Sequence, residues 1–134
     1  MANVLFVCVE NAGRSQLSEA LFTRRTAGTH GARSAGSAPA AALNDRVVAA
    51  LAELGIDIAG RVPRALDAAD AEWADVVVTM GCGDACPYVP GTRYVDWDLP
   101  DPKRMSLDEV RALRDDVATR VEALLAELEH APIG

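Results

Sequence analysis

The chain is poor in basic charge, in long apolar runs and in cysteine, and the first two scarcities each exclude a class of partner. Acidic residues outnumber basic ones by 20 to 13, for a net charge of −7. A nucleic-acid-binding domain normally carries a basic patch, so we expect no nucleic-acid partner. No apolar run approaches the roughly 20 residues that span a bilayer, so we expect no membrane partner.

The cysteine content points to a reducing compartment. Three cysteines are too few, and odd in number, for a disulfide framework. The N-terminus passes directly into an apolar segment, without the basic and cleavable parts of a signal peptide. We therefore expect a cytoplasmic protein whose thiols do chemical work. Half of the residues are apolar, which predicts a folded chain, and the length predicts a single domain over residues 1–134.

Short apolar segments alternate with helix-like ones. The predicted strands are four segments, at residues 3–7, 30–36, 76–78 and 93–97. The predicted helices lie between and after them, at residues 15–27, 44–55, 68–73 and 106–128. Asn44 is a plausible N-cap, and Ser106 with Glu109 forms a capping-box pattern. This alternation predicts an α/β fold with a parallel sheet and right-handed crossovers.

The segment from Cys8 to Ser15 carries most of the chemistry, and it lies between the first predicted strand and the first predicted helix. A helix N-terminus offers unpaired N–H groups and a partial positive charge, and Arg14 adds a permanent one. Both favour a thiolate at Cys8 and a bound oxyanion. We expect Gly13 to turn successive N–H groups inward. Cys8 is then the nucleophile, and the predicted oxyanion-binding residues are Val9, Glu10, Asn11, Ala12, Gly13, Arg14 and Ser15.

This Cys-x5-Arg-Ser motif, close to the N-terminus, resembles that of the low-molecular-weight tyrosine phosphatase superfamily, which also contains arsenate reductases. The resemblance covers essentially the whole chain. It implies a three-layer α/β/α fold with a four-stranded parallel sheet in the order 2-1-3-4. It also implies that Cys8 attacks, that Arg14 clamps the oxyanion, and that the loop is supported by Asn11, Ser15 and Ser34.

The resemblance further implies a general acid from a late Asp-Pro pair. Asp101-Pro102 matches it best, with Asp98 and Asp96 as other candidates. Tyrosine phosphatases of this family place aromatic residues after that pair, to line a slot for the phosphotyrosine ring. Here Lys103 and Arg104 follow, which favours a small inorganic oxyanion such as arsenate.

A second segment, from Thr79 to Pro87, resembles the redox loop of arsenate reductases. In the thioredoxin-coupled members this resemblance implies that Cys8 attacks arsenate, Cys82 resolves the adduct as a disulfide and Cys86 passes that disulfide to thioredoxin. The spacing between Cys82 and Cys86 is shorter than in those members. It also fits a branch in which mycothiol attacks the adduct and a glutaredoxin-like protein completes the reduction.

Several alternatives stay open at this stage. The chain could hydrolyse phosphomonoesters through a phosphocysteine, as a low-molecular-weight phosphatase does, or act as a non-catalytic anion or redox sensor. Cys82 and Cys86 could simply pack in a loop. Structural zinc wants four ligands, and with Cys8 committed elsewhere we expect no metal and no bound cofactor, only an external thiol reductant. Glu10 could face solvent or pair with Arg14 or Lys103.

Overall fold

A single parallel sheet organises the molecule. The structure, a computed structural model, describes residues 1–81 and 90–130, so the predicted roles of Cys82 and Cys86 fall on positions outside its described part. The strands lie in the order β2-β1-β3-β4, as predicted. Each differs from its predicted bounds by one residue at one end, and the observed strands are β1 (Asn3–Cys8), β2 (Gly31–Gly36), β3 (Val76–Thr79) and β4 (Arg93–Asp96).

Strand β1 is central, because β2 pairs with one of its edges and β3 with the other. Its register places Cys8 opposite Gly36 of β2 and Val7 opposite Thr79 of β3. The residues from Val4 to Val7 are all 0% exposed. A strand that is covered on both faces needs apolar side chains at successive positions, and this explains why the N-terminal segment shows no polar alternation.

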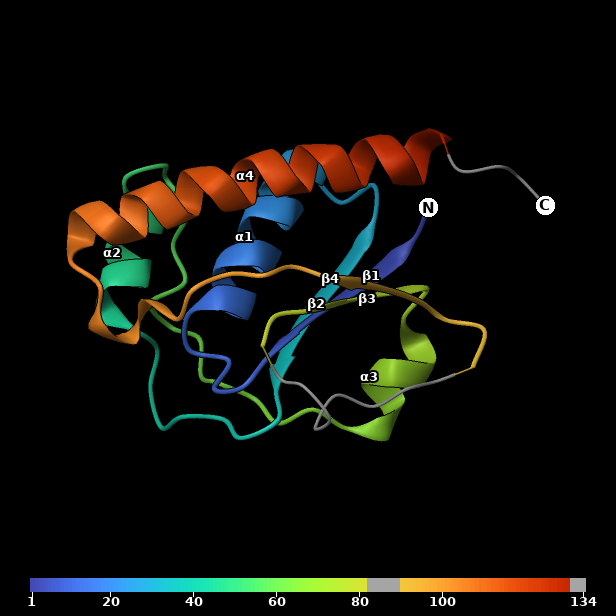
Figure 1. Ribbon diagram of the computed structural model, residues 1–134, viewed down its shortest axis with the longest axis horizontal. Helices are drawn as coiled ribbons and strands as arrows, with labels where there is room; N and C mark the ends of the chain where they lie inside the picture. Colours follow the sequence, from blue (N-terminus) through green and yellow to red (C-terminus); the bar gives the residue numbers. More distant parts are fainter. Residues whose placement is uncertain (82–89, 131–134) are drawn as a thin grey trace.

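Helices cover both faces of the sheet. Figure 1 shows α1 (Arg14–Thr26), α2 (Asp45–Ala52) and α4 (Leu107–His130) on one side and α3 (Ala68–Trp73) on the other. The larger apolar core lies beneath the three helices, where the ring of Phe6 is 5.4 Å from that of Phe22. The predicted three-layer α/β/α architecture is therefore confirmed.

Helix caps that the sequence predicts are present. The Asn44 side chain accepts hydrogen bonds from the backbone N–H groups of Arg46 and Val47, at 2.9 and 3.2 Å. Ser106 and Glu109 exchange the two bonds of a capping box, at 3.1 and 3.2 Å. These bonds satisfy N–H groups that a helix start leaves unpaired.

Helix α2 is shorter than predicted. It ends at Ala52, and the chain then tightens through bonds from Leu54 N to Leu51 O and from Gly55 N to Ala52 O, each 2.9 Å. Leu54, which falls within the predicted helix, lies beyond the end of the observed one and is 36% exposed. A 3₁₀ helix at Pro102–Arg104 was not predicted. Within residues 1–81 and 90–130, no helix has both the length and the apolarity that crossing a bilayer requires.

Candidate active site

The candidate nucleophile lies at the carboxyl end of the central strand. Cys8 is the last residue of β1 and is 2% exposed, and α1 begins at Arg14. From β1 the chain continues to β2 on one side of it and then crosses to β3 on the other side. Such a switch point is where open parallel sheets bind their ligands, beyond the strand ends. The fold therefore brings the loop from Val9 to Gly13 to the expected position.

The carbonyl groups of this loop are held on its outer side. A peptide is planar and trans, so a carbonyl that points outward turns the N–H of the following residue inward. Asn11 N confirms this geometry, because it donates to Cys8 Sγ at 3.2 Å. The bonds that hold the carbonyls come from the segment after β2, and they run from Ser37 N to Cys8 O, from Ala38 N to Val9 O, from Ala40 N to Glu10 O and from Asn44 N to Ala12 O.

Hydrogen bonds from the loop converge on the Cys8 sulfur. Ser15 Oγ lies 2.9 Å from Cys8 Sγ, and Asn11 Nδ2 donates to the same Ser15 oxygen at 2.8 Å. Since that oxygen already accepts from an amide, its own hydrogen is free to point at the sulfur. A hydroxyl and a backbone N–H then both donate to the Cys8 sulfur.

The left-handed residue of the loop is Asn11, not Gly13. Asn11 has φ 52° and is fully buried, and asparagine is one of the few residues that tolerate this region. Gly13 has φ −134° and ψ −86°, outside the left-handed region. Its small size serves another purpose, because a Cβ at Gly13 would lie 2.6 Å from Cγ of Pro102.

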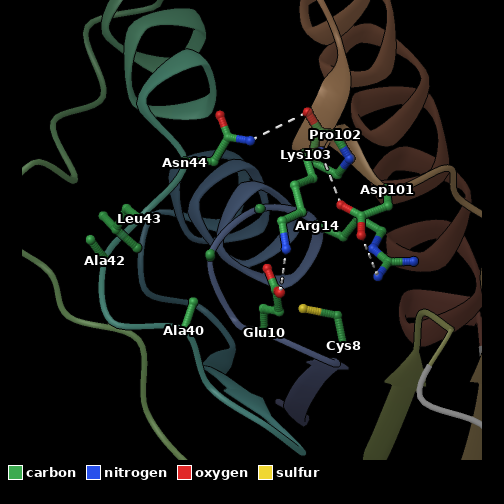
Figure 2. Close-up of a pocket in the computed structure, with 12 residues that line it drawn as sticks. Cys8, Glu10, Arg14, Ala40, Ala42, Leu43, Asn44, Asp101, Pro102 and Lys103 are labelled. Carbon is green, nitrogen blue, oxygen red and sulfur yellow. Dashed lines mark hydrogen bonds and ion pairs between the residues drawn. The ribbon is translucent and has the colours of Figure 1, made fainter.

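Arg14 is fixed beside the pocket by groups far along the chain. Its Nη1 donates to the carbonyl of Leu99 at 3.4 Å, and its Nη2 lies 3.9 Å from Oδ2 of Asp101. Gly81 lies against the same guanidinium, since a Cβ there would be 2.7 Å from Nη1. The motif arginine and the candidate general acid thus meet at one site, as Figure 2 shows.

The three candidate acids occupy different positions. Asp101 lines the pocket and its side chain is 53% exposed. The carboxylate of Asp96 accepts from Thr79 Oγ1 at 2.8 Å, and Asp98 is exposed. Neither of these two lines the pocket around Cys8, so the geometry favours Asp101 for the role.

Glu10 pairs with Lys103, one of the alternatives that the sequence left open. Lys103 Nζ lies 3.2 Å from Glu10 Oε1, and Figure 2 shows the lysine side chain reaching down from the 3₁₀ helix. The carboxylate that would repel an anion is therefore neutralised locally. The pocket has a volume of about 250 Å³, and its described lining residues include no aromatic side chain.

Two supporting residues of the loop were not recognised from the sequence. Gln16 Nε2 and Arg64 N both donate to Asn11 Oδ1, at 3.0 and 2.9 Å. Ser34, which was predicted, connects to the loop through Arg64, whose Nη1 donates to the Ser34 carbonyl at 2.7 Å. Gln16 directly follows Ser15 and could have been noticed, whereas Arg64 belongs to no motif. Among the described residues, no three His, Cys, Asp or Glu side chains gather as a metal site would require.

A cysteine thiol beneath a cradle of backbone N–H groups and one arginine defines a class of protein that holds a tetrahedral oxyanion for attack by sulfur. A match over almost the whole chain identifies the particular family. The sequence model of the low molecular weight phosphotyrosine protein phosphatases matches residues 3–132, and the chain belongs to this family.

Individual relatives are named arsenate reductases. A glutaredoxin arsenate reductase of Synechocystis sp. is 34% identical, with 96% of this chain and 99% of the relative aligned. A thioredoxin-dependent arsenate reductase of Corynebacterium glutamicum is 35% identical with a TM-score of 0.85, over 98% of this chain but 64% of its own length. A structure described as an arsenate reductase in the phosphate binding state is 34% identical with a TM-score of 0.82, over 95% and 98% of the two chains.

Proposed function

We propose that the chain is an arsenate reductase that uses Cys8 as its nucleophile and an external thiol system as its reductant. The observation that carries the proposal is the buried Cys8 sulfur, which receives hydrogen bonds within a pocket that contains Arg14 and lacks aromatic lining among the described residues. Relatives named arsenate reductases, at 34–35% identity, support the same substrate class.

The first step is nucleophilic attack on arsenic. The Cys8 thiolate forms a sulfur–arsenic bond, and one arsenate oxygen leaves as water after protonation, for which Asp101 is the proposed acid. Arg14 and the inward N–H groups of the loop neutralise the remaining oxygens. Arsenic remains As(V) at this stage, because the thiolate donates one electron pair and the leaving oxygen takes another away.

The second step is the reduction. A second thiolate attacks the sulfur of Cys8, the sulfur–arsenic bond breaks, and its electron pair stays on arsenic, which leaves as arsenite. We propose Cys82 as this thiol and Cys86 as the one that passes the disulfide to a thioredoxin-type protein. Gly81, which directly precedes Cys82 in the chain, lies against Arg14 and so supports the assignment. In the mycothiol route, that small thiol would instead attack arsenic and displace Cys8, and a glutaredoxin-like protein would then reduce the resulting thiol–arsenate and release arsenite.

The test compares donors and substrates on the same preparation. Arsenate turnover is measured with thioredoxin and its reductase, with mycothiol and a glutaredoxin-like protein, and against hydrolysis of para-nitrophenyl phosphate. We expect arsenate turnover with one of the two donors and weak ester hydrolysis. Ester hydrolysis without arsenate turnover under either donor would instead assign the chain to the phosphatases.

Matched cysteine variants locate the relay. Cys8→Ser should abolish both reactions, whereas Cys82→Ser and Cys86→Ser should abolish thioredoxin-coupled turnover and leave ester hydrolysis unchanged. If both of the latter variants keep full arsenate turnover with thioredoxin, the three-cysteine relay is wrong. Retained turnover with mycothiol alone would favour the second route.

A further inference from the structure

Arg61 lies in the connection between α2 and α3 and contacts the first two turns of α1. Its Nη1 donates to Glu19 Oε2 at 2.8 Å and to Gln16 Oε1 at 3.3 Å. Gln16 is 2% exposed, and the Glu19 side chain is 14% exposed. Since an arginine side chain can only donate, this contact requires the carbonyl oxygen of the Gln16 amide to face Arg61.

The later bonds all run in the direction that this orientation of Gln16 requires. With its oxygen turned to Arg61, Gln16 presents its NH₂ group to Asn11 Oδ1, at 3.0 Å. Asn11 therefore presents its own NH₂ group to Ser15 Oγ, at 2.8 Å. The serine hydroxyl is left to donate its hydrogen to Cys8 Sγ, at 2.9 Å. One guanidinium thus begins a one-way series of bonds that ends on the sulfur.

The same connection supplies a second, backbone contact. Arg64 N donates to Asn11 Oδ1 at 2.9 Å, and the Arg64 guanidinium is held by both oxygens of Asp70, which is 1% exposed. The Arg64 contact holds the Asn11 amide in the orientation that the series requires, and the Arg61 contact holds the Gln16 amide in the matching one. The two arginines therefore act on successive members of the series.

We propose that Arg61 is a positioning residue for the reaction and that, through Gln16 and together with the Arg64 contact on Asn11, it holds Ser15 as a hydrogen-bond donor to Cys8. The inference rests on the proposed function only in taking Cys8 as the nucleophile, and it holds equally for attack on arsenate and on phosphate. Arg61 touches neither substrate nor sulfur, so its effect is on how much Cys8 is thiolate at a given pH.

The test measures the fraction of Cys8 that is thiolate as a function of pH. In a Cys82→Ser/Cys86→Ser background Cys8 is the one remaining thiol, and its rate of alkylation by iodoacetamide is followed against pH. We expect Arg61→Ala to move the midpoint of this curve upward by about half a pH unit, a roughly threefold loss of thiolate at low pH. Arg61→Lys, which keeps a donor and a charge, should recover part of the shift.

Two controls separate positioning from charge and from folding. Arg33 lines the same 450 Å³ cavity as Arg61 but pairs with Asp70 and stacks on Trp73, so Arg33→Ala removes the same charge and should leave the midpoint in place. Thermal melts show whether each variant is folded at the assay temperature.

A double-mutant cycle tests the route. If Arg61 acts through Gln16, Arg61→Ala causes no further shift in a Gln16→Ala background. An unchanged midpoint in folded Arg61→Ala, an equal shift in Arg33→Ala, or additive shifts in the double variant would each overturn the inference. None of these readouts requires arsenate turnover, so the proposed function can fail independently.

Discussion

At the scale of single residues, the Cys8 loop depends on a close approach by the end of β2. A Cβ on Gly36 would lie 2.6 Å from the carbonyl oxygen of Val9 and 2.9 Å from the nitrogen of Asn11. Both are backbone atoms of the loop, so they cannot move aside as the end of a flexible side chain could. Glycine at this position therefore sets how the loop sits on the sheet.

We predict that Gly36→Ala lowers the free energy of unfolding by about 1–3 kcal/mol, the usual cost of overpacking. It should also reduce turnover by about tenfold or more, because the N–H groups that face the anion are displaced. Gly60→Ala is the matched control, since a Cβ there meets nothing within 4 Å. Chemical denaturation and steady-state kinetics check both effects, and a fully active Gly36→Ala protein would contradict this reading.

Residue roles were predictable where a motif is contiguous and not where contacts join distant segments. Cys8, Arg14 and Ser15 follow one another within a short loop whose chemistry can be read directly. The partner of Glu10 could not be chosen, because Lys103 approaches it only once the sheet has assembled. Arg61 is also far from the loop in sequence, and no residue pattern marks it.

At the scale of helices and strands, α2 and α4 are joined by a charged cluster around Glu53. Its carboxylate accepts hydrogen bonds from Arg111 and Arg114, two arginines of α4. These bonds lower the pKa of Glu53 from 4.5 to about 2. Because the pKa is lower in the folded state, the contribution to stability is present above the unfolded value and is lost as the pH falls toward 2.

We therefore predict that Glu53→Gln lowers the melting temperature by a few degrees near neutral pH, and that the difference from the wild type shrinks as the pH is lowered below about 4.5. Asp115→Asn is the control, because Asp115 contacts Arg114 within α4 and does not join two helices. Thermal melts across this range check the prediction. A difference that stays constant with pH would show that the ion pair is not its source.

Element bounds were accurate where a cap could be read. Asn44 and Ser106 set helix starts through their own side chains, so local sequence was sufficient. The end of α2 was placed too late, because the tight turn after Ala52 has no side-chain signature and Leu54 is apolar without being buried. The 3₁₀ helix at Pro102–Arg104 is too short for any periodicity to reveal it.

At the scale of the whole molecule, a net charge of −7 coexists with a pocket for anions. The global field repels an anion, so affinity depends on local groups, of which Arg14 carries the permanent charge. A ligand that binds only the folded chain stabilises it by mass action. Thermal stability therefore reports on occupancy of the pocket.

We predict that inorganic phosphate or arsenate raises the melting temperature, by about 10 °C when its concentration is ~100 times its Kd. Arg14→Ala should remove this response, while Arg46→Ala, a change at an exposed position of α2, should keep it. Differential scanning fluorimetry over a series of anion concentrations is sufficient. Equal responses in the two variants would mean that the anion binds elsewhere.

The order of the strands separates the position of the Cys8 sulfur from the chemistry of the pocket rim. Cys8 ends the central strand β1, whose core residues are fully buried, so its amides should exchange with solvent only when the whole chain unfolds. Glu10 and Lys103 lie at the solvent-facing rim. A lineage with this fold can thus change its rim and acquire another oxyanion as substrate while the position of its sulfur is inherited unaltered.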